Sequence, residues 1–402
     1  MHPTVGRKPA RRHGRRCDTR ETVTTKVVDA LELLEELVRI DSANPAMGGP
    51  GEVAVGDRVA DVLRGIGCEV STHDVSGGRR NVIGVLPGRG EGPVLLLEAH
   101  LDTVAQPRDG LPVQRSDGRL VGRGACDTKG SLSAMIAALA RLAETDDRPA
   151  IVFAGAVDEE VTMTGSRALV DQLPHVDGAI IGEPTSLIPV RAHNGLARLR
   201  VVARGRSAHT SRAHLGVNAI AAASRAVLAI QDKLVPRLQA RSHPLAGPAL
   251  ATAAMIRGGV AANLVPDLCE ITLDRRLSPG EDPAAALAEI DALLDDLRAG
   301  GDELEREEPD LLIPAVETAA DHPLVRVAED AASAVLGRPV QAGGVPYGTD
   351  ASGLSGVGGI PCVVLGPGSI DQAHTDDEWV SLDEVRQAVD IYVEVARRFA
   401  AR

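Results

Sequence analysis

The sequence predicts an α/β fold in which a mostly parallel sheet, covered by helices on both faces, is interrupted by an inserted domain. The chain has 402 residues, 44% hydrophobic and 25% charged, which is enough for two globular domains. Short continuous apolar runs alternate with helix-like stretches, a pattern typical of strands buried on both faces of a parallel sheet. Between residues 193 and 313 the order changes to that of a β-α-β-β-α-β unit.

The elements of the larger sheet follow from hydrophobic periodicity. Apolar residues at helical spacing predict two helices ahead of the sheet, over 24–40 and 53–66. Continuous apolar runs predict four buried strands, at 94–97, 150–154, 179–181 and 361–365. Helical spacing predicts covering helices at 131–144 and 382–399.

The inserted unit follows from the same criteria. Its predicted strands are 196–204, 250–257 and 268–276, its helices are 217–234 and 283–298, and a final strand closes it. We therefore expect a discontinuous first domain, 21–192 with 314–402, around the insertion 193–313.

Residues 1–20 contain seven basic residues and one acidic residue, and we expect a disordered tail outside the fold.

Composition excludes several classes of partner. A net charge of -13 and only five aromatic residues argue against nucleic-acid binding, which needs a basic surface or stacking platforms. No apolar stretch approaches a membrane span, and no apolar region follows the basic residues as in a secretory signal, so we expect a cytoplasmic protein without a membrane partner. Five scattered cysteines without a Cys-x-x-Cys pair predict reduced, mostly buried thiols.

Metal-binding residue types recur where the predicted strands end. They are His100 and Asp102 after the first strand, residues 158–160 (DEE) after the second, Glu183 after the third, and His374 beyond the fourth; Asp127 lies in a glycine-containing loop before a helix. Open α/β sheets bind ligands outside the carboxyl ends of their strands, so these side chains should converge. One His-x-Asp or one acidic triplet is more often a solvated turn, but the repeated placement favours a site for zinc, cobalt or manganese.

The residue types also fit amide hydrolysis by divalent cations that share a carboxylate. They can polarise a carbonyl group and lower the pKa of a water, while a neighbouring carboxylate takes the proton and passes it to the leaving amine. Glu159 and Glu160 are adjacent, and successive side chains of an extended chain point in opposite directions. One of them can therefore bind metal while the other reaches the water.

The motifs resemble those of the co-catalytic metallopeptidases and deacylases that include acetylornithine deacetylase, succinyl-diaminopimelate desuccinylase, aminoacylase and glutamate carboxypeptidase. The resemblance covers nearly everything after residue 21 and rests on 98–104 (EAHLDTV), 122–130 (GRGACDTKG), 158–160 (DEE) and 182–185 (GEPT). Two further stretches look most like the acetylornithine deacetylases, namely 183–193 (EPTSLIPVRAH) and 365–374 (LGPGSIDQAH).

The resemblance implies a role for each residue of the site. Asp127 would bridge two metal ions, Zn or Co, of which one is also held by His100 and Glu183 and the other by Glu160 and His374. Glu159 would be the general base. Asp102 would orient His100, and the peptide bond after Asp127 would be cis, as it often is in the family.

For the insertion, the resemblance implies a lid and dimerisation domain. His209 would reach across a homodimer to stabilise the oxyanion, and Asn263 and Arg276 would contact substrate; a cap or a surface ion pair is the ordinary role of such residues. The segment at Gly348 and Thr349 resembles a substrate-contacting segment, although it could equally be a simple turn. The family often has His-Lys-Gly where this chain has 193–195 (HNG), which leaves the exact substrate open.

Rival functions fit less well. The glycine-rich stretch 88–92 precedes a strand, whereas a dinucleotide-binding loop follows one, and a Gly-x-Ser-x-Gly motif is absent from the sequence. A metal-binding protein without activity would need the ligands but not Glu159. We therefore expect a hydrolase of N-acyl amino acids similar to acetylornithine deacetylase, with a desuccinylase, a dipeptidase or a carboxypeptidase as the alternatives.

Overall fold

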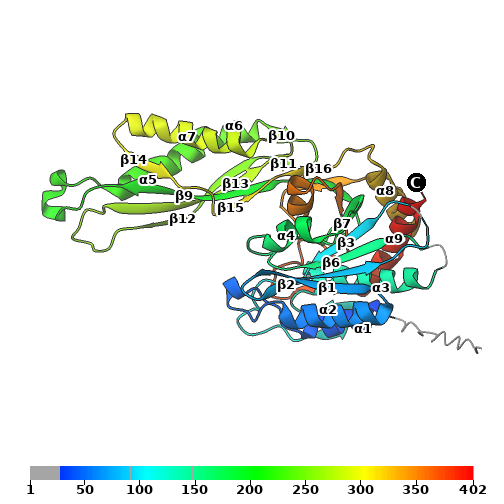
Figure 1. The fold of residues 1–402 in the computed structure, drawn as a ribbon. Coiled ribbons are helices and arrows are strands. Elements are labelled where there is room, and N and C mark those ends of the chain that lie inside the picture. Colours follow the sequence, from blue (N-terminus) through cyan, green and yellow to red (C-terminus); the bar gives the residue numbers. More distant parts are fainter. Residues whose placement is uncertain (1–27, 91, 146–147, 402) are drawn as a thin grey trace, which may run out of the picture.

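The chain folds around two separate sheets that lie side by side in an elongated molecule (Figure 1). The computed structural model describes residues 28–90, 92–145 and 148–401. The basic tail predicted for residues 1–20 lies outside these residues. Among the described helices, none is long and apolar enough to cross a membrane.

The larger sheet has nine strands and a parallel centre. Its order is β1-β2-β6-β3-β7-β18-β8-β16, with β17 beside β8. The central strands β6, β3, β7 and β18 are parallel to their neighbours in that group, whereas β1, β2 and β16 add antiparallel edges. The strands are β1 (Glu69–Ser76), β2 (Arg79–Leu86), β3 (Leu95–His100), β6 (Ile151–Ala156), β7 (Gly178–Ile181), β8 (Val190–His193), β16 (Val316–Glu317), β17 (Gly343–Val345) and β18 (Cys362–Val364).

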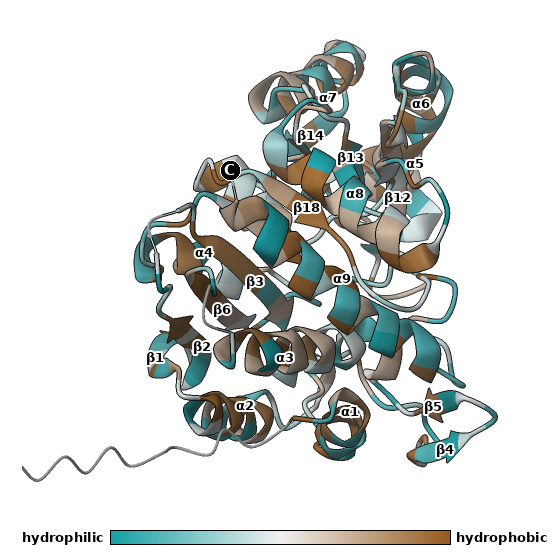
Figure 2. Cartoon of the chain, turned by 90° about the vertical axis from the view of Figure 1, so that its right-hand side faces the viewer, coloured by the Kyte–Doolittle hydropathy of each residue, from teal (hydrophilic) through white to brown (hydrophobic). Residues whose placement is uncertain are grey.

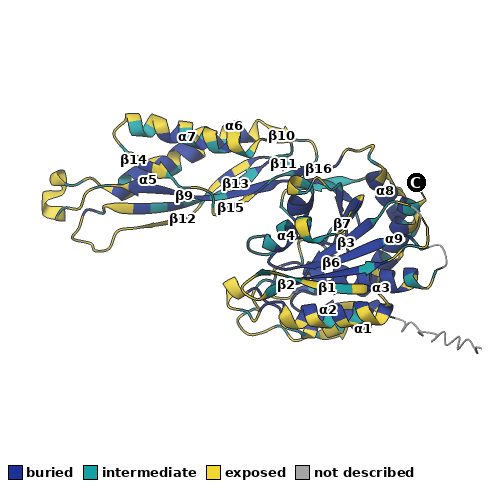
Figure 3. Cartoon of the chain, viewed as in Figure 1, coloured by how far each residue is buried: buried dark blue, intermediate teal, exposed yellow. Residues whose placement is uncertain are grey.

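Helices cover both faces of this sheet, because its central strands are apolar on both sides (Figure 2). One face packs on α1 (Ala30–Arg39), α2 (Val53–Ile66), α3 (Gly130–Ala143), α8 (Pro323–Leu336) and α9 (Leu382–Ala400). The other packs on α4 (Thr164–Gln172) and a π-helical turn, Ser352–Val357. Figure 3 shows the result, with the central strands buried and the outer faces of α1 and α2 exposed.

The smaller sheet is antiparallel and carries its helices on one side (Figure 1). Its order is β12-β13-β9-β14, with β15 also paired to β9. The elements are β9 (Gly195–Arg204), α5 (Ala219–Ala229), α6 (Val235–Gln239), β12 (Leu250–Gly258), β13 (Leu268–Leu277), α7 (Pro283–Ala299), β14 (Glu303–Arg306) and β15 (Leu311–Ile313). Apolar residues of β9, β13, α5 and α7 form its own core.

Shorter elements complete the fold. A three-stranded sheet contains β4 (Gln114–Ser116), β5 (Arg119–Val121) and β19 (Trp379–Ser381). A hairpin of β10 (Ser242–His243) and β11 (Gly247–Pro248) lies between α6 and β12. Short helical turns are Pro45–Met47, Ala125–Lys129, Thr210–Leu215 and Ile230–Leu234.

The larger and the smaller sheet are joined by two chain segments, 193–195 and 313–315, which pack tightly against each other. We call this contact the crossing. A Cβ atom on Gly195 would lie 2.4 Å from both the amide nitrogen of Ala315 and the carbonyl oxygen of Ile313, so only glycine fits there. Beside it, the side chain of Asn194 donates a hydrogen bond to Ala246 in the β10–β11 hairpin. Burial lowers the pKa of His193 to about 4, so this histidine is neutral at physiological pH. The start of β9 is therefore closely packed against residues 313–315.

The predicted fold class is confirmed, including the β-α-β-β-α-β order of the insertion. The predicted buried strands correspond to β3, β6, β7 and β18, and the four described cysteines are buried, free thiols. The division into domains at 192/193 and 313/314 stays a prediction. The sequence reasoning missed β1, β2, β8 and α8, and the long helix predicted at 217–234 instead passes through a π-helical turn into α6.

Candidate metal centre

The candidate site lies where three neighbouring parallel strands of the larger sheet end. β3 lies between β6 and β7, and its last residue, His100, is paired with Ala156, the last residue of β6. Residues 158–160 follow β6 after one valine, and Glu183 follows β7 after one glycine. The topology therefore brings these side chains to one edge of the sheet.

Asp127 lies between the two predicted histidine ligands. Nε2 of His100 lies 3.0 Å from Oδ1 of Asp127, and Nε2 of His374 lies 3.3 Å from its Oδ2. The same nitrogen of His374 lies 3.0 Å from Oε2 of Glu160. Because the two oxygens of one carboxylate face different imidazoles, Asp127 is placed so that two cations could share it.

The other carboxylates gather around His100. Ligand atoms of His100, Glu159 and Glu183 lie within 4.8 Å of one another, as do those of His100, Asp127 and Glu160. The structure thus brings all five predicted ligands to one place. It also puts Glu159, the predicted base, in the same group as the predicted ligand Glu183.

The charges of the site fit divalent cations. Burial, followed by repulsion from neighbouring carboxylates, raises the pKa of Glu159 and of Glu183 well above the usual range for glutamate. Hydrogen bonds with Asp127 and Glu160 raise the pKa of His374 to about 10. Crowding so many carboxylates in a buried space is electrostatically costly, and cations between them would offset that cost. Carboxylate and imidazole donors suit zinc and its neighbours.

Asp102 holds the turn that carries the two glutamates. Its Oδ1 accepts a hydrogen bond from the amide of Glu159 at 3.0 Å, and its Oδ2 accepts one from the amide of Glu160 at 3.3 Å. The Asp102 carboxylate lies 3.6 Å from Nδ1 of His100, whereas the main-chain oxygen of Asp102 lies nearer that nitrogen, at 3.0 Å. The carboxylate predicted to orient His100 therefore also fixes the backbone of the base and of one ligand.

Glu378 fixes the Asp127 loop in a similar way, and the sequence reasoning missed it. Its Oε1 accepts hydrogen bonds from the amides of Cys126 and Asp127, at 2.9 and 3.0 Å. Its Oε2 accepts a hydrogen bond from the buried Arg123 at 2.7 Å. The Asp127–Thr128 peptide bond is cis, as the resemblance implied. Glu378 follows His374 by only four residues, and that proximity was the available signal.

Of the residues predicted in the insertion, two lie far from the metal centre. β9 starts beside the crossing at Gly195 and spans about 30 Å of extended chain before His209 follows it. The side chain of His209 is exposed and contacts Ser211, and Asn263 is hydrogen-bonded to the next residue, Thr210. His209 and Asn263 therefore lie together at the far end of the smaller sheet.

Arg276 lies at the opposite end of that sheet. It is paired with Leu196, one residue from the crossing, and its guanidinium contacts Asp274 at 2.8 Å. Thr349 is buried, and its hydroxyl lies 3.2 Å from Nε2 of His193. A Cβ atom on Gly348 would lie 3.3 Å from the carbonyl oxygen of Asn194. Arg276, Gly348 and Thr349 thus lie near the crossing.

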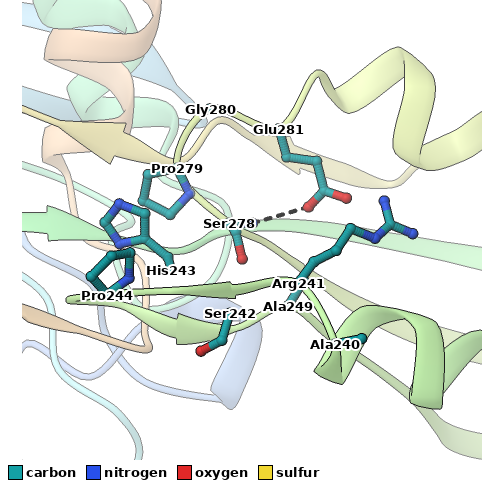
Figure 4. Close-up of a pocket in the computed structure, with 10 residues that line it drawn as sticks. All are labelled: Ala240, Arg241, Ser242, His243, Pro244, Ala249, Ser278, Pro279, Gly280 and Glu281. Carbon is teal, nitrogen blue, oxygen red and sulfur yellow. Dashed lines mark hydrogen bonds between the residues drawn. The ribbon is translucent and has the colours of Figure 1, made fainter.

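An open pocket of about 490 Å³ lies elsewhere, in the smaller part beside the β10–β11 hairpin (Figure 4). Glu281 accepts a hydrogen bond there from the amide of Ser278 at 3.0 Å. Arg241, which also lines the pocket, is paired with Glu289. The described residues around this pocket do not include a group of metal ligands. The pocket is therefore distinct from the metal centre.

Comparison with known proteins identifies similar sequences and folds. Residues 96–398 match peptidase family M20/M25/M40. The acetylornithine deacetylase of Vibrio campbellii is 32% identical over 381 residues, covering 90% of this chain and 96% of that protein, and the one of Vibrio vulnificus is 32% identical over 377 residues, covering 90% and 95%.

Two solved structures share the fold. Aminopeptidase PepT from Bacillus cereus has a TM-score of 0.76 at 24% identity, covering 93% of this chain and 100% of that one. A dinuclear metal binding peptidase of the M20 family from Bacillus subtilis has a TM-score of 0.68 at 20% identity, covering 92% and 98%.

Proposed function

The chain belongs to peptidase family M20/M25/M40, and from this premise we propose that it hydrolyses the amide bond of N-acyl amino acids in the manner of an acetylornithine deacetylase. The chain is therefore a hydrolytic enzyme that acts on amides. The observation that carries the proposal is the position of Asp127 between His100 and His374. The relatives named acetylornithine deacetylase, which match 90% of this chain, support the choice of substrate class.

In this proposal Asp127 would be shared by two cations, Zn or Co. His100 and Glu183 would hold one, and Glu160 and His374 the other. When bound, the cations polarise the amide carbonyl and favour ionisation of a water. The exposed side of His374 leaves an approach from solvent.

Glu159 would act as the general base in the same reaction. Its carboxylate would take a proton from water and then deliver it to the leaving amine. Asp102 keeps the amide of Glu159 in place. Arg276, beside the crossing, would bind a substrate carboxylate. Gly348 and Thr349, near the same crossing, would contact the substrate as the resemblance implies.

We expect amine release from N-acetyl-ornithine to depend on metal. A chelator should abolish turnover, and added Zn²⁺ or Co²⁺ should restore it, because the carboxylate cluster binds substrate productively only with its cations. The measurement is amine release from N-acetyl-ornithine, N-succinyl-diaminopimelate, neutral N-acetyl amino acids and several dipeptides. Preference for N-acetyl-ornithine would support a role in arginine biosynthesis, which we propose to take place in the cytoplasm.

A peptidase is the second candidate, because structural neighbours include a tripeptidase from Staphylococcus aureus and human carnosine dipeptidase 1. Chelator-sensitive cleavage of dipeptides with no deacylation would establish it and reject the deacetylase. Metal binding without turnover on any substrate of the panel would reject both and favour a metal-binding protein without activity.

We also propose a homodimer formed through the smaller sheet. Its edge strand β12 has a neighbour on one side only among the described strands, and Met255 and Ile256 on it are exposed. An unpaired edge with apolar side chains is a typical surface for pairing with a second chain. A dimer would also give distant His209 a role, since it could reach the partner's metal centre.

Mixing two inactive variants tests this role of His209. We expect His209→Ala and Glu159→Ala chains to be inactive alone and to recover about a quarter of wild-type turnover when their protomers exchange, because one site in each mixed dimer is complete. Sedimentation measures the dimer in the same samples. A monomer at the assay concentration, or a mixed dimer without activity, would contradict the proposal.

A further inference from the structure

A buried network outside the metal ligands holds the turn that carries Glu159 and Glu160. The turn begins at Asp158, which follows β6 and has a φ of 70°. Residues other than glycine adopt this left-handed region at a cost, so surrounding contacts must stabilise it. The network supplies those contacts.

Arg79, at the start of β2, links two buried carboxylates of the network. Its Nη1 donates a hydrogen bond to Oδ1 of Asp158 at 2.7 Å, and its Nε donates one to Oε2 of Glu52 at 2.9 Å. A second contact joins its Nη2 to Glu52. Glu52 in turn accepts a hydrogen bond from the amide of Asp158 at 3.1 Å. Arg79 therefore holds Asp158 directly through the side chain and indirectly through the backbone.

Asn44 extends the network to the residue that holds the glutamates. Its Nδ2 donates hydrogen bonds to Oδ1 of Asp158 at 3.0 Å and to Oδ2 of Asp102 at 2.7 Å. Asp102 accepts the amides of Glu159 and Glu160. The backbone of the two glutamates is thus held by Asp102, and Asp102 and the preceding Asp158 both accept hydrogen bonds from the side-chain amide of Asn44. Asn44, Asp102 and Asp158 are all buried.

We propose that Arg79 is a positioning residue of the metal centre, acting through Asp158 and Glu52 to hold Glu159 and Glu160 in place for metal binding and catalysis. The contacts of Arg79 are with the network and not with the five predicted ligands. Arginine suits this role because its planar fork reaches two carboxylates at once. The expected effect of Arg79 on catalysis rests on the proposed function, whereas its expected effect on metal affinity does not.

The test compares Arg79→Met with Arg80→Met. Arg80 is the next residue of the same strand, and its side chain is exposed and paired with Asp57 on the surface. Metal-stripped full-length chains are titrated with Zn²⁺ in competition with a chelator, and kcat and KM are measured at saturating metal. We expect Arg79→Met to bind one of two ions about 10- to 100-fold more weakly, with a similar loss in kcat and little change in KM. Arg80→Met should match the wild type.

The variant Arg79→Lys shows whether an effect of Arg79→Met comes from lost positioning of the network, from the lost positive charge or from misfolding. Lysine keeps the cation but offers no planar fork, so we expect metal affinity and kcat between those of the wild type and Arg79→Met. If Arg79→Met does not fold, Arg79→Lys carries the test. Reduced thermal stability with wild-type metal affinity in a folded Arg79 variant would overturn the proposal. If no substrate is turned over even by the wild type, the proposed function fails, and the Zn²⁺ titration still decides the role of Arg79.

Discussion

Replacing Glu159 by glutamine should reduce turnover by about 100- to 10,000-fold while the chain still binds its metal ions. Glutamine preserves the size of the side chain but cannot accept the proton that hydrolysis must move from water to the amine. The backbone should stay in place, because Asp102 holds the amide of residue 159 and not its side chain. Steady-state kinetics and elemental analysis of the purified variant measure the two effects.

The matched control is Asp371→Asn, which makes the same change from carboxylate to amide at an exposed position on the loop that carries His374. Its turnover should equal that of the wild type. Since Glu159 shares a group with His100 and Glu183, a ligand role is the rival assignment. A variant that loses metal together with turnover would establish that rival, and one that keeps turnover would remove Glu159 from catalysis.

Replacing Asp127 by alanine should remove both metal ions and bring turnover below detection. Its two carboxylate oxygens face different imidazoles, so one substitution removes a donor from both positions. Substitution of a residue that we propose to ligate only one ion, such as Glu183→Ala, should leave the second ion bound. Metal content per chain, measured after dialysis against metal-free buffer, distinguishes these outcomes.

The control for Asp127→Ala is Asp109→Ala, in an exposed part of the chain between β3 and β4. It should keep both ions. Circular dichroism should show that Asp127→Ala remains folded, so that loss of metal is not a consequence of unfolding. An Asp127→Ala chain that retains two ions would contradict the bridging role.

The sequence predicted those parts of the fold that depend on strong burial. Strands β3 and β6 are buried along their whole length, so their apolar runs are continuous and easily seen. β1 lies at the sheet edge with alternating exposed and half-buried residues, and its polar sequence carries little signal. The edge strand β1 was missed for this reason, whereas β2, which is buried over most of its length, carried an apolar run that the sequence reasoning overlooked.

The candidate site was predictable to a similar extent. Its predicted ligands follow buried strands or lie in motifs, so their convergence could be inferred from topology. Glu378 and Arg79 could not be found in this way. Each contacts the site from a distant part of the chain, Glu378 from 251 residues beyond Asp127 and Arg79 from 79 residues before Asp158. Arg79 on its strand has no sequence pattern that reveals its partner, and Glu378 offers only its proximity to His374.

The position of β18 has a consequence for how the protein is made. β18 is paired with both β7 and β8, although 168 residues of chain separate β8 from β18. On the ribosome, the smaller sheet, which uses only residues 195–313, emerges complete while the larger sheet still lacks this strand. Domains generally fold as units during synthesis. The insertion can therefore fold first, and a metal centre that includes the predicted ligand His374 can assemble only after that residue has emerged from the ribosome.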